Sequence, residues 1–128
     1  MDDDPTFDVV LYLDIGRAKG DAAPDIVIVE RFARRFQEWI WPGKRCPRVY
    51  YDPRSLAFDA GARAVLPAKA VVIDRMKAPV TSADPTPAAY HRNIQLGIVL
   101  SGGTTPSRIA TYFESLVEQQ SLRPLEIK

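Results

Sequence analysis

Three aspartates follow apolar segments of the sequence and are its most direct candidates for metal chemistry. Asp14 comes after Val-Val-Leu-Tyr-Leu, Asp52 after Arg-Val-Tyr-Tyr and Asp74 after Ala-Val-Val-Ile. If these segments form parallel strands, their carboxyl ends share one edge of a sheet, where ligands bind in such folds. Carboxylate oxygens suit Mg²⁺ or Mn²⁺, with substrate phosphate supplying further ligands. We therefore predict a metal site at these three residues. The alternative is that each aspartate caps a turn or helix.

A Ser-Gly-Gly-Thr-Thr turn at residues 101–105 is the second candidate site. It lies between the apolar run Ile94–Leu100, which indicates a buried strand, and a segment whose apolar residues keep helical spacing. Thr105 is expected to cap that helix, with Pro106 at its first position. The first N–H groups of a helix have no intrahelical acceptor and lie at the positive end of its dipole, which favours phosphate or carboxylate.

We predict that this turn receives the ligand and that two basic residues after the first strand neutralise charge near the reacting centre. The predicted ligand-binding residues are Ser101, Gly102, Gly103, Thr104, Thr105, Arg17 and Lys19. Ser101 lacks the flanking pattern of a catalytic nucleophile, so a serine that only forms the turn is the better interpretation.

Strands that alternate with helices would position these residues. Strands are predicted at Phe7–Leu13, Pro47–Tyr51, Ala62–Leu66, Ile94–Leu100 and Leu125–Ile127, and a strand or a buried helical turn at Ala68–Met76. This alternation predicts a single α/β domain over residues 1–128, with a mostly parallel central sheet and helices on both faces. Residues 1–6 are predicted to form a flexible tail. Residues 77–92 contain three prolines and are predicted to form a long loop.

The longest predicted helix runs from Pro24 to Ile40. Its apolar residues fall at three- and four-residue steps, and charged residues occupy the opposite side, so the segment is amphipathic. The Ile-Val-Ile-Val run near its start is β-prone, and a strand there is the alternative.

Basic and aromatic residues gather in and after this helix. The basic residues are Arg31, Arg34, Arg35, Lys44, Arg45 and Arg48. They form either a solvated surface or a local patch for phosphates. Of Trp39 and Trp41, one is expected in the core, whereas an exposed one would mark a protein interface or a base-stacking surface.

Composition excludes several classes of protein. The hydrophobic fraction of 46% and charged fraction of 26% are those of a globular domain rather than a disordered chain. No apolar run approaches the roughly 18 residues of a membrane helix, so we expect no membrane association and a cytoplasmic location. The lone Cys46 excludes an internal disulfide. A net charge of +1 gives no global argument for nucleic acid, and a local basic patch would be needed.

The order VVLYLD, an amphipathic helix, RVYYDP, AKAVVIDRM and GIVLSGGTTP resembles the NYN branch of PIN-like nucleases over Val9 to about Leu116. The resemblance lies in an acid after the first strand, a tyrosine-rich second strand ending in aspartate, an Ala/Val segment bearing an acid, and a Ser-Gly-rich turn. It implies metal-dependent cleavage of RNA with Asp14 and Asp74 as catalytic acids and Asp52 as a nearby candidate. The SGGTTP turn also looks like the adenosine-side turn of actin-like ATPases, although the first-strand phosphate loop of that fold is absent.

The sequence departs from the nuclease pattern at positions where chemistry would occur. Asp14 is followed by Ile15-Gly16-Arg17 rather than a further acid and asparagine, and Gly103 and Thr105 stand where that family carries aspartates. These departures imply a different ligand or a site without catalysis.

Two functions therefore follow from the sequence. The first is a phosphate-ligand or nucleic-acid-binding domain, including a divalent-metal-dependent phosphodiesterase or ribonuclease. The second is a non-catalytic interaction or assembly subunit that contacts a protein partner or copies of itself.

Overall fold

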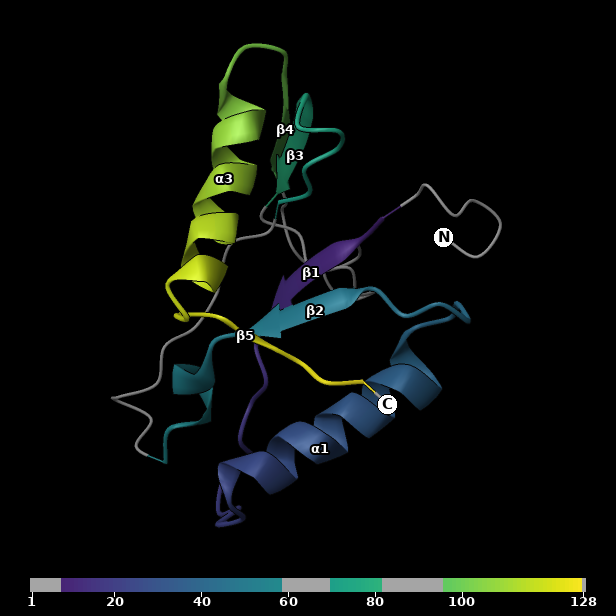
Figure 1. The fold of residues 1–128 in the computed structure, drawn as a ribbon, viewed down its shortest axis with the longest axis vertical. Coiled ribbons are helices and arrows are strands. Elements are labelled where there is room, and N and C mark those ends of the chain that lie inside the picture. Colours follow the sequence, from purple (N-terminus) through teal and green to yellow (C-terminus); the bar gives the residue numbers. More distant parts are fainter. Residues whose placement is uncertain (1–7, 59–69, 82–95, 128) are drawn as a thin grey trace. The chain divides into compact units, whose positions relative to one another are not determined.

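The computed structural model describes residues 8–58, 70–81 and 96–127, and the chain divides into two compact units. The first unit comprises Met1–Leu66 with Gln119–Lys128, and the second comprises Pro67–Glu118. Each unit has its own small sheet. Strands β1, β2 and β5 form the sheet of the first unit, and strands β3 and β4 form that of the second (Figure 1).

The sheet of the first unit combines a parallel and an antiparallel pair. β1 (Val10–Leu13) lies parallel to β2 (Arg48–Tyr51), and β5 (Arg123–Pro124) pairs antiparallel with the other edge of β2. The rings of Tyr12 and Tyr50 stack across the parallel pair with their centroids 5.8 Å apart. The structure confirms strands in the first and second predicted segments.

Helix α1 (Asp25–Arg35) packs its apolar stripe against this sheet. It follows Pro24, whose extended backbone (φ −55°, ψ 149°) sets the start of the helix. Asp25 in the first turn and arginines in the last turn suit the helix dipole. The helical prediction for this segment is confirmed and the strand alternative is wrong, because burial of one stripe outweighs the β-propensity of Ile-Val-Ile-Val. The core consists of Ile15, Ile28, Ala33, Phe36, Val49, Tyr51, Leu56 and Leu125.

Two irregular helical turns complete the described part of the first unit. Residues Phe36–Ile40 form a π-helical turn that continues α1, and the Trp41 N–H closes it by donating to the Phe36 carbonyl at 2.9 Å. Pro53–Leu56 form a 3₁₀ turn directly after β2. Asp52 occupies the capping position of this turn, and its side chain accepts the Arg54 N–H.

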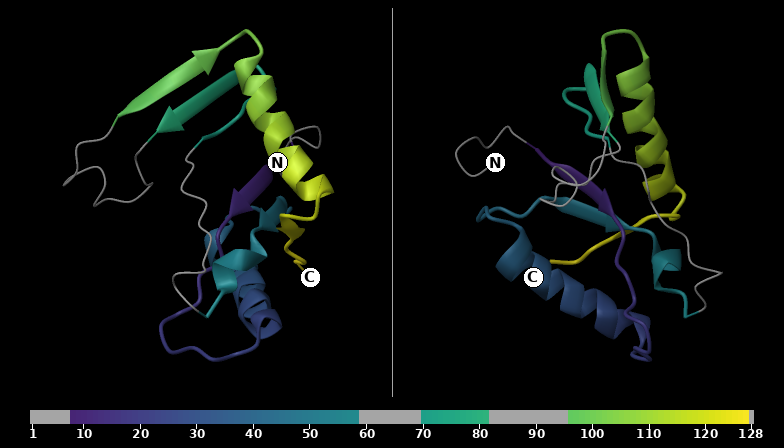
Figure 2. Two further views of the ribbon diagram at one scale, coloured as in Figure 1. Left: turned by 90° about the vertical axis from the view of Figure 1, so that its left-hand side faces the viewer. Right: turned by 180° about the vertical axis from the view of Figure 1, so that it is seen from behind.

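The second unit is a β-hairpin beside a helix (Figure 2). β3 (Lys77–Thr81) and β4 (Gly97–Ser101) are antiparallel, with Ala78 opposite Leu100, and α3 (Thr105–Glu118) follows β4. Ala78 is fully buried. The apolar face of α3 that the sequence predicts is half-buried, and it consists of Ile109, Ala110, Phe113, Leu116 and Val117.

The predicted fold, a mostly parallel central sheet with helices on both faces, is wrong. The chain forms two small sheets, and two of their three strand pairs are antiparallel. Part of the difference arises at Asp74 and Arg75, which have φ of 51° and 56° and form a tight turn between Ile73 and Lys77, so residues 70–73 run antiparallel to β3. A parallel neighbour requires a long crossover, whereas a tight turn returns the chain antiparallel.

The prediction of a loop over residues 77–92 is wrong at its beginning, because Lys77–Thr81 form β3. Pro79 has no N–H, but its carbonyl accepts the Val71 N–H at 3.0 Å, so this proline still takes part in pairing. The remainder of the predicted loop, the predicted strand Ala62–Leu66 and the predicted tail 1–6 lie outside the described residues. Within the described ranges, no helix has the length and apolar character needed to cross a membrane.

Candidate functional site

The parallel pairing of β1 and β2 brings two of the three predicted acids to one edge. Leu13 lies opposite Tyr51 at the carboxyl ends of these strands, and Asp14 and Asp52 follow them directly. Asp14 is half-buried, and Asp52 is 7% exposed. The parallel register therefore places Asp14 and Asp52 directly after the paired ends of neighbouring strands. The third acid, Asp74, belongs to the second unit.

Asp52 is engaged by the residues that follow it. Its Oδ1 accepts a hydrogen bond from the Arg54 backbone N–H at 2.9 Å, and its Oδ2 accepts one from Arg54 Nη2 at 2.8 Å. Hydrogen bonding from the Arg54 side chain holds the pKa of Asp52 below its ordinary value. Ser55 Oγ also donates to the carbonyls of Ile15 and Asp52, at 2.9 and 2.7 Å. Asp52 therefore acts as a helix cap, which is the alternative that the sequence left open.

Arg17 holds the loop between β1 and α1 in place. Its guanidinium donates to three carbonyls: Nε to Leu56 at 2.8 Å, and Nη1 to Asp21 at 2.9 Å and Ala23 at 2.6 Å. Nη2 donates to the Asp25 carboxylate at 2.5 Å. These bonds use four of the five N–H donors of the group, and the Phe58 ring lies 3.9 Å from its centre.

The burial of this guanidinium sets Arg17 apart from the other predicted cation. The side chain of Arg17 is 2% exposed, so its geometry is that of a structural residue rather than of a phosphate ligand. Lys19, two residues later in the same loop, is exposed.

Asp74 lies at the tip of the turn before β3 rather than at the end of a parallel strand. Its backbone is left-handed, which aspartate tolerates better than most residues, and the residue is exposed. Within the described ranges, no cluster of three or more His, Cys, Asp or Glu side chains with metal-binding spacing occurs.

The Ser101–Thr105 turn connects β4 to α3 as predicted. Gly102 and Gly103 have φ of 71° and 63°. This left-handed backbone conformation is rarely adopted by residues that carry a side chain. The Gly102 N–H donates to the Met76 carbonyl at 2.8 Å, which ties the turn to the hairpin. The Thr104 carbonyl accepts the Arg108 N–H at 2.9 Å. Thr104 is thus the capping residue and Thr105 the first helical residue, one position earlier than predicted.

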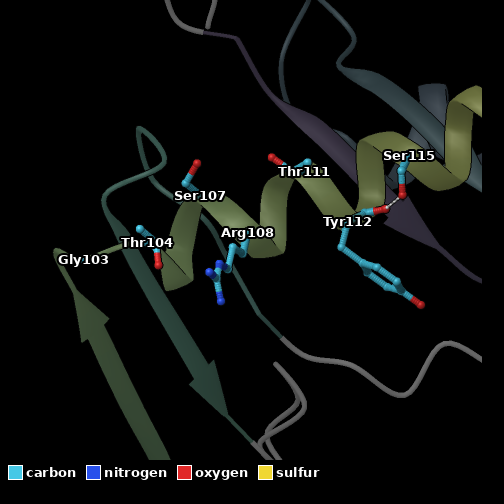
Figure 3. A pocket seen from close by; sticks show the side chains of 7 residues that line it. All are labelled: Gly103, Thr104, Ser107, Arg108, Thr111, Tyr112 and Ser115. Atoms are coloured by element: carbon cyan, nitrogen blue, oxygen red, sulfur yellow. Dashed lines mark hydrogen bonds between the residues drawn. The ribbon is translucent and has the colours of Figure 1, made fainter.

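An open groove of about 670 Å³ runs from this turn along one face of α3. It is lined by Gly103, Thr104, Ser107, Arg108, Thr111, Tyr112 and Ser115. Thr104, Arg108 and Tyr112 project from one side of the helix, and Ser107 and Thr111 form the neighbouring row (Figure 3). Because residues three and four apart share a helix face, the groove combines hydroxyl groups with one cation and one aromatic ring.

Arg75 fixes one border of this groove. Its Nη1 donates to Glu114 Oε1 at 2.6 Å, and its Nη2 donates to Thr111 Oγ1 at 2.7 Å. This contact joins the tight turn before β3 to the middle of α3. Glu114 balances the charge of Arg75, so Arg108 supplies the positive charge of the described lining.

The groove also contains residues outside the predicted site. The predicted site stopped at Thr105, whereas the groove continues to Ser115. The signal was present in the sequence: hydroxyl and basic residues recur at three- and four-residue steps from Thr104, opposite the apolar stripe of the same helix. Of the predicted ligand-binding residues, Gly103 and Thr104 line the groove.

Comparisons of the chain with protein-family models, with curated proteins and with solved structures find no match.

Proposed function

We propose that the chain binds a phosphate-containing ligand, such as RNA or a nucleotide, in the groove along α3. The observation that carries the proposal is the lining itself, in which Arg108 lies among side-chain hydroxyls at the start of a helix. A guanidinium and hydroxyl groups are suitable donors to phosphate oxygens, and the helix dipole adds positive potential at the same end. Tyr112, at 60% exposure, offers a ring for stacking one turn further along.

Replacing Arg108 with alanine tests this proposal. Native protein is titrated with inorganic phosphate and with adenosine 5′-monophosphate by isothermal titration calorimetry. Loss of a charge-assisted hydrogen bond of about 1.5 to 3 kcal/mol should weaken binding of both ligands roughly tenfold or more. The matched control is Arg123→Ala, which removes an exposed arginine of the first unit and should leave both affinities unchanged. Equal affinities of native protein and Arg108→Ala would reject the groove as the site.

Metal-dependent hydrolysis of RNA at Asp14, Asp52 and Asp74 stays a prediction of the sequence. It is tested by adding Mg²⁺ or Mn²⁺ to native protein and single-stranded RNA and comparing native protein with Asp14→Asn. If Asp14 holds the metal, the variant should cleave at least about a hundredfold more slowly. Metal-stimulated cleavage that Asp14→Asn leaves intact would contradict the assignment.

A second candidate function, assembly of two copies of the chain, is supported by β4. Among the described residues, β4 pairs only with β3, and its other edge meets no strand within these ranges. Leu96, Ile98 and Val99 are 76%, 56% and 65% exposed, and residues 96–101 contain no charge and no proline. Natural edge strands usually carry charged residues or proline, which prevent pairing with another chain. Antiparallel pairing of two copies about Val99 would oppose Ile98 to Leu100 and satisfy the backbone groups of both edges.

The variant Val99→Lys tests assembly, because a lysine at the two-fold axis places like charges opposite each other. Sedimentation velocity over a hundredfold concentration range should show association of the native protein and a monomer for Val99→Lys. The control Ile26→Lys alters another exposed aliphatic residue, which is in α1, and should associate as the native protein does. A native protein that stays monomeric throughout this range would exclude the candidate.

A further inference from the structure

The π-helical turn at the end of α1 determines which tryptophan reaches solvent. In a continuous α-helix, Trp39 and Ile40 would follow Phe36 by three and four residues and would extend the buried stripe. The π turn adds one residue between Phe36 and its partner, so the Trp41 N–H donates to the Phe36 carbonyl instead. The Trp41 ring then stacks on Phe36 with centroids 6.2 Å apart and planes 17° apart. Trp39 is turned outward and is 82% exposed.

Arginines surround this outward-facing tryptophan. A shallow hollow of about 290 Å³ is lined by Arg31, Arg34, Arg35, Glu38 and Trp39. Its lining thus carries three positive charges and one negative charge. Arg31 contacts Asp21 at 3.2 Å, and the guanidinium of Arg35 lies 5.7 Å from the centre of the Phe32 ring. All the lining residues belong to α1 and its π turn, so one rigid element carries both the cations and the ring.

We propose that this surface, named here the arginine–tryptophan surface and consisting of Arg31, Arg34, Arg35 and Trp39, binds single-stranded nucleic acid. A base would stack on the exposed ring of Trp39, and the arginines would contact the phosphates on either side of it. Unpaired bases stack on aromatic side chains in this manner, and basic residues follow the backbone of the strand.

The lining favours nucleic acid over a protein partner. The cores of protein interfaces are depleted of charge and surround an aromatic anchor with further apolar groups. Here the described lining consists of charged residues and a single ring, with no aliphatic side chain. The surface belongs to the first unit and does not depend on the groove along α3, which belongs to the second.

Fluorescence anisotropy with a labelled twelve-nucleotide oligouridine tests the inference. Native protein and Trp39→Ala are compared at 50 mM salt, because stacking of one base is worth about 1 to 3 kcal/mol. We expect Trp39→Ala to bind about tenfold more weakly. Ile26→Ala is the matched control, since it removes another exposed hydrophobic side chain of α1 that lies outside the lining of the hollow, and it should bind the oligonucleotide as the native protein does.

A second variant separates stacking from charge. Arg34→Ala combined with Arg35→Ala should flatten the dependence of the logarithm of affinity on the logarithm of salt concentration by about 0.7 for each phosphate that an arginine no longer neutralises. A double-stranded RNA of the same length should bind more weakly than the single strand, because its bases cannot reach Trp39.

Three outcomes would overturn the inference. They are absence of oligouridine binding by the native protein at 50 mM salt, unchanged affinity of Trp39→Ala, and self-association that Trp39→Ala abolishes while oligouridine fails to bind. The last outcome would identify a protein interface instead. Failure of phosphate binding in the α3 groove, measured with Arg108→Ala, would leave these results unaffected, so the two proposals fail separately.

Discussion

Replacing Arg17 with alanine is expected to lower the free energy of unfolding by about 3 kcal/mol, because hydrogen bonds to charged groups each contribute about 1.5 to 3 kcal/mol. The guanidinium bonds to the carbonyls of Leu56, Asp21 and Ala23 and to the Asp25 carboxylate. Removing it leaves acceptors of the β1–α1 loop and the 3₁₀ turn without their donor. The midpoint of urea unfolding, followed by circular dichroism, measures the loss.

Two further variants decide between a structural role and a ligand role for Arg17. Arg17→Lys keeps the charge but cannot reproduce the planar fork of donors, so we expect it to be nearly as unstable as Arg17→Ala. Lys19→Ala, which removes the exposed neighbouring cation, should leave stability unchanged. If Arg17→Lys retained native stability, or if Arg17→Ala kept its stability and lost phosphate affinity, the structural assignment would be wrong.

Replacing Phe36 with alanine should cost about 3 to 5 kcal/mol of stability, the usual range for removing a buried phenylalanine. Phe36 is 2% exposed, and its ring stacks on both Phe32 and Trp41. Its loss leaves a cavity at the point where the π turn joins the core. The unfolding midpoint in urea and the tryptophan emission maximum report the loss of stability and the altered environment of Trp41.

Trp39→Ala is the matched control for this prediction. The two aromatic residues lie three positions apart, yet Trp39 is 82% exposed. Its removal should change stability by less than about 0.5 kcal/mol, as for other surface substitutions. A large destabilisation by Trp39→Ala would show that the ring packs in the core and would contradict the role of the π turn in turning it outward.

Most elements of the fold are predictable because local patterning determines them. The β1 and β2 segments are short apolar runs, and α1 keeps an apolar stripe at helical spacing. The junction of β4 and α3 is also predictable, since a Gly-Gly turn and a following proline define it. In each case the residues that decide the structure are close neighbours in the chain.

The arrangement of the strands is harder to predict from the sequence, because it depends on turn geometry. Ala-Val-Val-Ile followed by Asp74 looks like a buried strand ending in an acid, yet Asp74 and Arg75 form a left-handed turn. Neither residue is glycine, so the usual signal of such a turn is missing. That single turn makes residues 70–73 run antiparallel to β3, so Asp74 lies in a turn rather than at the end of a parallel strand.

The candidate site was predicted in part for a similar reason. The sequence placed the site at the turn before α3, and Gly103 and Thr104 do line the groove. Arg17 was selected for its charge, but the carbonyls that bury it come from residues up to 39 positions away. Conversely, Arg108 and Tyr112 belong to a polar helix face that resembles an ordinary solvated surface. Their position in the groove that begins at the turn distinguishes them.

The most direct test of ligand binding along α3 is a titration of ¹⁵N-labelled native protein with inorganic phosphate, followed by amide chemical shifts. Binding in the groove predicts saturable shifts of the Gly103, Thr104, Ser107 and Arg108 amides, with much smaller shifts in β1 and β2. The Arg108→Ala protein should show the same shifts only at roughly tenfold higher phosphate, as expected for the loss of about 1.4 kcal/mol. Shifts that do not saturate, or that fall outside the groove residues, would contradict the proposed function.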